Sequence, residues 1–168
     1  MNKWNTKTIV LMGLLAAINI VLARFLSFQP VEQVRISLDK LPIILTAILF
    51  GPLEAAMVGL VADFLGCTLF SLISWYAPMA LTPVIIGLWS GVFRKKLLEK
   101  KVWKIFLIIF TGNILGQMLY NTYWLSILYG NPFWALFPVK VLQYTVISVV
   151  ETSVLYWLLK RGVEKIAD

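Results

Sequence analysis

Ionisable side chains interrupt the most apolar parts of this sequence, and they are the residues best suited to bind a polar molecule. Arg24 ends one apolar stretch, Asp63 lies about halfway along another, and Lys140 lies within a third. A charge at the centre of a membrane helix costs at least roughly 2.5–3.5 kcal/mol, so each is a functional candidate. A carboxylate pairs with adjacent N–H donors, an Arg plane stacks on a π-face and a Lys binds carboxylates. This mixture fits a polar aromatic ring with an acidic tail.

Three amides recur at helical spacing further along the chain. Asn113, Gln117 and Asn121 stand at i, i+4 and i+8, with Tyr120 alongside, so one helix face carries all three amides. Lipid disfavours such a stripe, so it is expected to face protein or water. It has two interpretations: a hydrogen-bonding wall for a heteroaromatic ligand, or interhelical hydrogen bonds worth about 0.6 kcal/mol each.

The charged candidates also have structural interpretations. Asp63 could form a structural ion pair with an Arg, Arg24 could extend its stem to the membrane interface, and Glu151 is predicted to be structural. In the functional interpretation, residues of different helices converge on one pocket open to the outside. These are Arg24, Asp63, Gln117, Asn121 and Lys140.

Composition excludes several kinds of protein. Hydrophobic residues make up 60% of the 168 residues and charged residues 14%, against roughly 45–50% and 25% in soluble domains. Cys67 is the only cysteine and His is absent, so we expect no intrachain disulfide, metal site, Ser-His triad or cofactor. No phosphate-binding G-x-x-x-x-G-K-[ST] motif is present, so any ATP must be used by partners.

Apolar stretches of about membrane-spanning length follow one another along the whole chain. A span needs roughly 20 apolar residues, and Pro, Gly or charged residues divide the sequence into such lengths. We therefore predict an all-α integral membrane protein of six transmembrane helices in a single domain, 1–168. The predicted spans are 8–28, 38–51, 53–73, 76–93, 103–129 and 132–159.

Charge predicts how these spans are oriented. Lys and Arg concentrate before the first span, between the fourth and fifth, and after the sixth, which the formal charge of +7 reflects. With an even number of spans, the positive-inside rule places both termini in the cytoplasm. We expect a multi-pass protein of a bacterial plasma membrane. A bilayer explains the positive charge better than binding to nucleic acid does. The segment from Gln29 to Ser37 is the longest outer connection, and could be a lid over the pocket or a plain solvated loop.

Two segments resemble a known family. They are Arg35–Ile43 and Phe50–Gly66, in which a Pro, a Gly-Pro turn, a Gly and an Asp follow one another. This run is similar to the substrate-binding S components of energy-coupling factor (ECF) transporters. Ala23-Arg24-Phe25, Asp63-Phe64-Leu65-Gly66 and Pro138-Val139-Lys140 resemble the folate family in particular.

The resemblance implies a function and partners. It implies a six-helix protein that captures extracellular folate near its outer surface under the loop after the first span, with Arg24 and Asp63 on the pterin ring. Lys140, Arg35 or Lys40 would meet the carboxylates of folate. A membrane coupling subunit would dock on an A-x-x-x-A motif, which here reads Gly13-x-x-x-Ala17, and two ATPase subunits would drive release inside.

Two alternatives stay open. The turn after the third span, Ser71–Ala77, departs from the commonest folate-family pattern, so riboflavin, thiamine or a related heteroaromatic vitamin is the alternative ligand. A non-transport membrane protein, with the same polar residues joining its helices, is the other. An enzyme is not expected, because the chain has no His and no carboxylate cluster for a metal.

Overall fold

Helices account for nearly all of the structure. The computed structural model describes residues 5–31, 34–70 and 76–163. Its helices are α1 Thr6–Arg24, α2 Lys40–Leu49, α3 Pro52–Phe70, α4 Leu81–Val92, α5 Arg94–Leu98, α6 Val102–Asn113, α7 Thr122–Tyr129 and α8 Phe133–Lys160. A 3₁₀-helix, η1 Ala77–Ala80, precedes α4, a π-helix, η2 Ile114–Asn121, joins α6 to α7, and two short strands, β1 Phe28–Val31 and β2 Val34–Ile36, follow α1.

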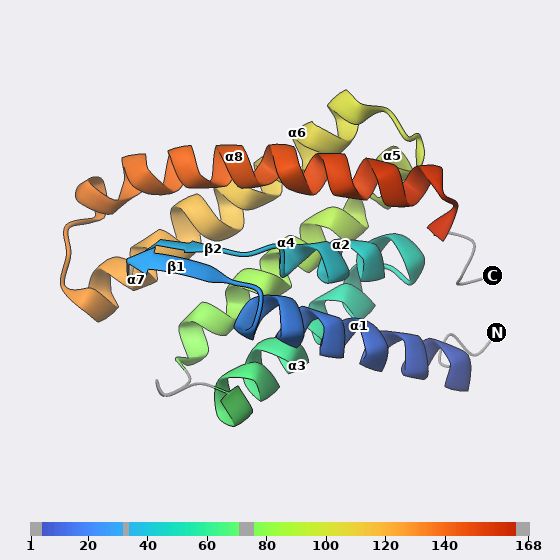
Figure 1. The fold of residues 1–168 in the computed structure, drawn as a ribbon, viewed down its shortest axis with the longest axis horizontal. Helices are drawn as coiled ribbons and strands as arrows, with labels where there is room; N and C mark the ends of the chain where they lie inside the picture. The colour runs from blue at the N-terminus through green and yellow to red at the C-terminus, as the bar shows by residue number, and fades with distance from the viewer. Residues whose placement is uncertain (1–4, 32–33, 71–75, 164–168) are drawn as a thin grey trace.

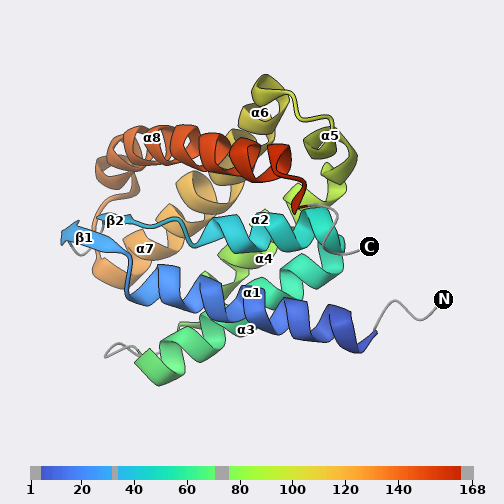
Figure 2. The ribbon, with the colours of Figure 1, turned by 45° about the vertical axis from the view of Figure 1, so that its right-hand side comes forward.

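The helices lie roughly side by side. In Figure 1, α8 crosses one side of the molecule, α1 and α3 lie on the opposite side, and α2 and α4 lie between them. The start of α1, the end of α8 and α5 are found toward one end, whereas the strands and α7 are found toward the other (Figures 1 and 2). The molecule therefore has two distinct ends.

Four helical segments are long and apolar enough to cross a membrane. They are Thr6–Arg24, Pro52–Phe70, Val102–Tyr129 and Phe133–Lys160. Their side chains include many exposed large hydrophobic groups, such as Leu69 at 67% and Leu142 at 73% exposure. Lipid is the solvent that such a surface requires.

Two further apolar helical segments are shorter, Lys40–Leu49 and Ala77–Val92. Nearly every residue of α2 is buried, so this helix is surrounded by protein. It ends where Gly51 adopts φ 130°, a conformation that favours glycine, and Pro52 then begins α3. The Gly-Pro pair thereby turns the chain from α2 into α3.

Close packing of α3 on α4 depends on small residues. A Cβ atom on Gly91 would lie 2.3 Å from Cα of Pro52, and one on Gly87 would lie 2.9 Å from the backbone carbon of Ala55. The backbones of the two helices therefore approach more closely than any larger residue would permit.

The segment after α1 differs from the predicted loop. Its strands pair antiparallel, with Phe28 opposite Ile36 and Val31 opposite Val34. β2 contacts α8, and the Ser37 hydroxyl donates to the Leu22 carbonyl of α1 at 3.2 Å. The hairpin thus connects α1 with α8 at the end of the molecule that also carries α7 (Figure 1).

Candidate functional site

Arg24 ends α1 against the C-terminal part of α3. Its Nη2 donates to the Cys67 thiol at 2.8 Å, and a Cβ on Gly66 would lie 3.2 Å from its Nε. Asp63 is half-buried and lies one helical turn before Cys67, so its carboxyl belongs to the same side of α3. The structure therefore places Arg24 on the part of α3 that carries Asp63. Gly66 is what gives the guanidinium room there.

Gln117 forms the centre of a second polar group. Its Oε1 accepts hydrogen bonds from Asn121 Nδ2 at 3.1 Å and from the Tyr144 hydroxyl at 2.9 Å. The side chain of Gln117 is buried, whereas Asn121 is half-buried. This amide pair leaves Gln117 Nε2 and Asn121 Oδ1 as the donor and acceptor groups from which a ligand site could be built.

Lys140 adds a buried cation to the same group. Only 4% of its surface is exposed, and its Nζ lies 5.8 Å from the centre of the Tyr144 ring, one helical turn later in α8. A buried ammonium requires an anion or strong dipoles nearby, and the face of an aromatic ring supplies part of that stabilisation. Tyr144 therefore links Lys140 to Gln117.

The predicted amide stripe divides into two levels. Asn113 Nδ2 donates to Ser148 Oγ and to Glu151 Oε2, both at 3.0 Å, and all three side chains are buried. This level joins α6 to α8 and is structural. Gln117 and Asn121 lie one and two turns further on, beside Lys140 and Tyr144.

Tyr120 has a different partner from its neighbours. Its hydroxyl donates to the Pro78 carbonyl of η1 at 3.0 Å. The bond fastens η2 to the start of α4, so the hydroxyl is occupied by protein rather than directed to the amides.

Several predicted features fall partly or wholly outside the described residues. Arg35 lies in β2, but its side chain is not described. Glu32 and Gln33 of the predicted lid lie outside the described residues. Part of the predicted turn at 71–77 does so as well.

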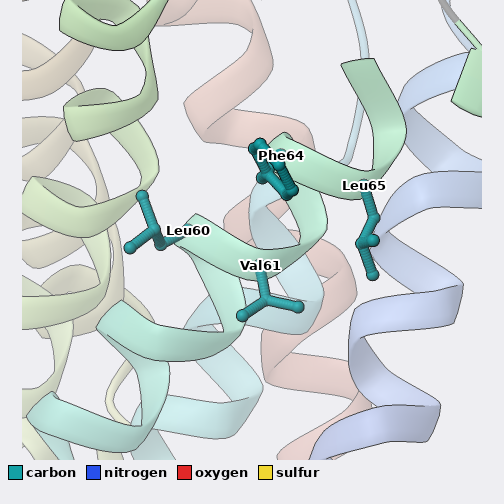
Figure 3. Close-up of a pocket in the computed structure, with 4 residues that line it drawn as sticks. All are labelled: Leu60, Val61, Phe64 and Leu65. Carbon is teal, nitrogen blue, oxygen red and sulfur yellow. The ribbon is translucent and has the colours of Figure 1, made fainter. Parts of the chain in front are cut away.

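The described residues show one apolar hollow on α3. It has a volume of about 280 Å³ and is lined by Leu60, Val61, Phe64 and Leu65 of that single helix (Figure 3). All four side chains are exposed, and no polar group lines the hollow. It is suited to lipid tails and is separate from the polar groups described above.

Among residues 5–31, 34–70 and 76–163, no three His, Cys, Asp or Glu side chains gather in a way that could hold a metal ion. The polar groups here can donate, accept and pair charge, which is the chemistry of binding.

Sequence reasoning missed Tyr144, and it noted Gly66 only as part of the motif around Asp63. The spacing Lys140–Tyr144 is i, i+4, and Gly66 follows Asp63 by three residues, so both signals were present in the sequence. What the spacing could not show was that Tyr144 reaches Gln117 on another helix.

Comparison with known proteins gives a consistent result. Residues 3–164 match the family described as "ECF-type riboflavin transporter, S component". The chain is 30% identical to the folate transporter FolT of Clostridium novyi (strain NT) over 149 residues, covering 88% of this chain and 84% of that one.

Solved structures are similar as well. One is FolT bound with folic acid, with a TM-score of 0.83 and 26% identity over 94% of this chain and 95% of that chain. Another is an S-component for biotin from an ECF-type ABC transporter, with a TM-score of 0.68 and 16% identity over 95% and 94%. The second likeness concerns the fold alone.

Proposed function

The chain belongs to the family of S components of ECF-type transporters, and from this premise we propose that it captures extracellular folate for import into the cell. The observation that carries the proposal is the likeness, over 94% of this chain, to FolT bound with folic acid. The relative at 30% identity is also a folate transporter.

Side-chain chemistry supports this ligand. The Asp63 carboxylate is suited to the adjacent N–H donors of a pterin ring, and the planar Arg24 guanidinium to its π-face. Gln117 and Asn121 add amide groups next to the buried Lys140, with Tyr120 alongside on η2. Lys140, with Arg35 from the hairpin, supplies positive charge for the glutamate carboxylates. These residues form one pocket in our proposal, covered by the hairpin.

The proposal includes a membrane arrangement. The chain is one domain, 1–168, whose six helical segments span the cell membrane with both termini in the cytoplasm. The hairpin then faces outward. One observation supports this orientation: the cation-rich α5 and the end of α8 lie at the opposite end of the molecule from the hairpin (Figure 1). Lys and Arg concentrate on the cytoplasmic side of membrane proteins.

Partner subunits supply the energy. A transmembrane coupling subunit docks on α1 at Gly13 and Ala17, and two ATPase subunits hydrolyse the ATP that drives release of folate inside. A Cβ on Gly13 would meet nothing within 4 Å, and Ala17 is exposed, so this face of α1 is open for a close helix contact.

Riboflavin is the second candidate ligand, because the matching family description names it. The test is a titration of the purified chain in detergent with folate, riboflavin and thiamine, in which tryptophan fluorescence reports binding. We expect folate to bind most tightly and Asp63→Asn to weaken it at least tenfold, since a charged hydrogen-bond partner is worth about 1.5–3 kcal/mol.

Thr68→Ala is the matched control on α3. Its hydroxyl is exposed and donates to the Phe64 carbonyl of its own helix, so the variant should bind like the parent. Tighter binding of riboflavin than of folate would identify riboflavin as the ligand in place of folate. No binding of any of the three vitamins would contradict the proposal.

A further inference from the structure

The end of α8 and the short helix α5 share one apolar cluster. Leu97 of α5 and Leu155 and Leu159 of α8 are fully buried in it. Residues that follow or precede these leucines and point outward therefore emerge at the same end of the molecule, which Figures 1 and 2 show opposite the hairpin.

Those outward residues are cations. Lys95 and Lys96 precede Leu97, and Lys160 and Arg161 follow Leu159, and all four are exposed. Lys101 is exposed in the turn between α5 and α6. Arg94 differs from them, because its Nη2 donates to the Leu49 carbonyl at the end of α2, 3.0 Å away.

One acidic residue accompanies the cations of α5 and of the turn that follows it. Glu99 is the single acidic residue of the sequence between positions 94 and 104, and it accepts a hydrogen bond from Lys104. That bond, with the charges of Lys101 and Lys96, holds the pKa of Glu99 below its ordinary value. Glu99 therefore offsets one positive charge, and the six Lys and Arg residues between positions 94 and 104 leave an excess of cations there.

Exposed tryptophans place these cations at the depth of lipid phosphates. Trp103, in the first turn of α6, is 68% exposed, and Trp157, in the last turn of α8, is 51% exposed. The Arg161 guanidinium lies 4.0 Å from the centre of the Trp157 ring. Tryptophan side chains of membrane helices sit at headgroup level, so the cations beside them do too.

We propose that Lys95, Lys96, Lys101, Lys160 and Arg161 form a binding surface for the headgroups of anionic phospholipids. Exposed apolar side chains adjoin the cations, for example Val92 at 69% and Val102 at 50%, as expected where a protein passes from hydrocarbon to headgroups. A nucleic acid or an acidic protein would have no use for this apolar border. The proposal does not rest on folate as the ligand.

The test compares lipids on the full chain. The purified protein in a neutral detergent is titrated with phosphatidylglycerol, phosphatidylcholine or inorganic phosphate, and bound lipid is counted by native mass spectrometry alongside the thermal unfolding midpoint. We expect phosphatidylglycerol to bind preferentially and to raise the midpoint. Each cation should contribute about fivefold in affinity.

Two matched variants isolate the charge. Replacing all five cations by Gln should abolish the preference for phosphatidylglycerol, whereas exchanging each Lys for Arg and Arg161 for Lys should preserve it. A cooperative thermal unfolding transition and an unchanged far-UV circular dichroism spectrum in both variants show that they are folded. Equal binding of the two lipids, an equal effect of inorganic phosphate, or a preference that survives the Gln variant would overturn the proposal.

Discussion

Buried polar side chains join the helices α6 and α8. Asn113 donates both of its observed hydrogen bonds to Ser148 and Glu151 on α8. Glu151 is fully buried, and its Oε1 has no hydrogen-bond partner among the described residues. The Asn113 amide is therefore the side-chain donor that the structure shows for the Glu151 carboxyl group.

Replacing Asn113 by Leu should destabilise the protein. The change removes two hydrogen bonds and leaves a buried carboxyl group without its donor, at a cost of about 1–3 kcal/mol. Glu151→Gln should cost less, because an amide oxygen can still accept from Asn113. Thermal unfolding in detergent measures both.

Ser153→Ala is the control for this pair, since Ser153 is exposed on α8 and bonds to its own helix. An Asn113→Leu variant as stable as the Ser153→Ala variant would contradict the structural role.

Lys140 is expected to act on one part of the ligand. Lys140→Gln should weaken binding of folate on the order of tenfold, since a charge-assisted hydrogen bond to a carboxylate is lost. It should leave binding of pteroate, which lacks the glutamate, much less affected. Competition titrations give both affinities.

Lys160→Gln provides the matched control, because this Lys is exposed at the other end of α8. Equal losses of affinity for folate and pteroate would contradict the role of Lys140 in binding the glutamate.

At the scale of elements, α3 and α4 depend on glycine for their contact. Gly91→Ala should destabilise the protein by about 1–3 kcal/mol, because its Cβ would overlap the backbone of Pro52, which cannot move aside. Gly13→Ala is the matched control, since nothing lies within 4 Å of its added methyl group. Unfolding midpoints of the two variants should differ clearly, and equal midpoints would contradict the packing.

The sequence indicated the helices better than their irregularities. Apolar runs divided by Gly51-Pro52 or by basic residues each hold a helix, because burial of backbone polar groups in lipid permits little else. The hairpin of β1 and β2, the 3₁₀ turn of η1 and the π-helix η2 were not predicted. Each depends on neighbouring helices rather than on local residue preferences.

The same limit applies to the candidate site. Spacing placed Gln117 and Asn121 on one helix face, and the structure shows them hydrogen-bonded. Spacing could not reveal that Asn113, on the same stripe, serves α8 instead, because its partners Ser148 and Glu151 are 35 and 38 residues away.

The orientation of the whole molecule can be tested directly. In a Cys67→Ser background, Asn131→Cys, between α7 and α8, should react with a membrane-impermeant thiol reagent applied to intact cells. Lys101→Cys should react only after the membrane is permeabilised, because the proposed topology places the cation-rich end in the cytoplasm. The reverse labelling pattern would invert the proposed topology.

The π-helix η2 changes the rotation of α7 about the helix axis relative to α6. Its i→i+5 pattern holds one more residue per turn than the α-helices on either side, so the side chains of α7 are rotated by about 100° from where an uninterrupted α-helix would place them. Thr122 and Leu125 consequently face protein, while Tyr123 and Ile127 face outward. Removing a single residue from Ile114–Asn121 would rotate α7 back, so that Tyr123 would take the buried position of Thr122 while α6 kept its packing. The one extra residue in this segment therefore decides which face of α7 packs against the rest of the protein.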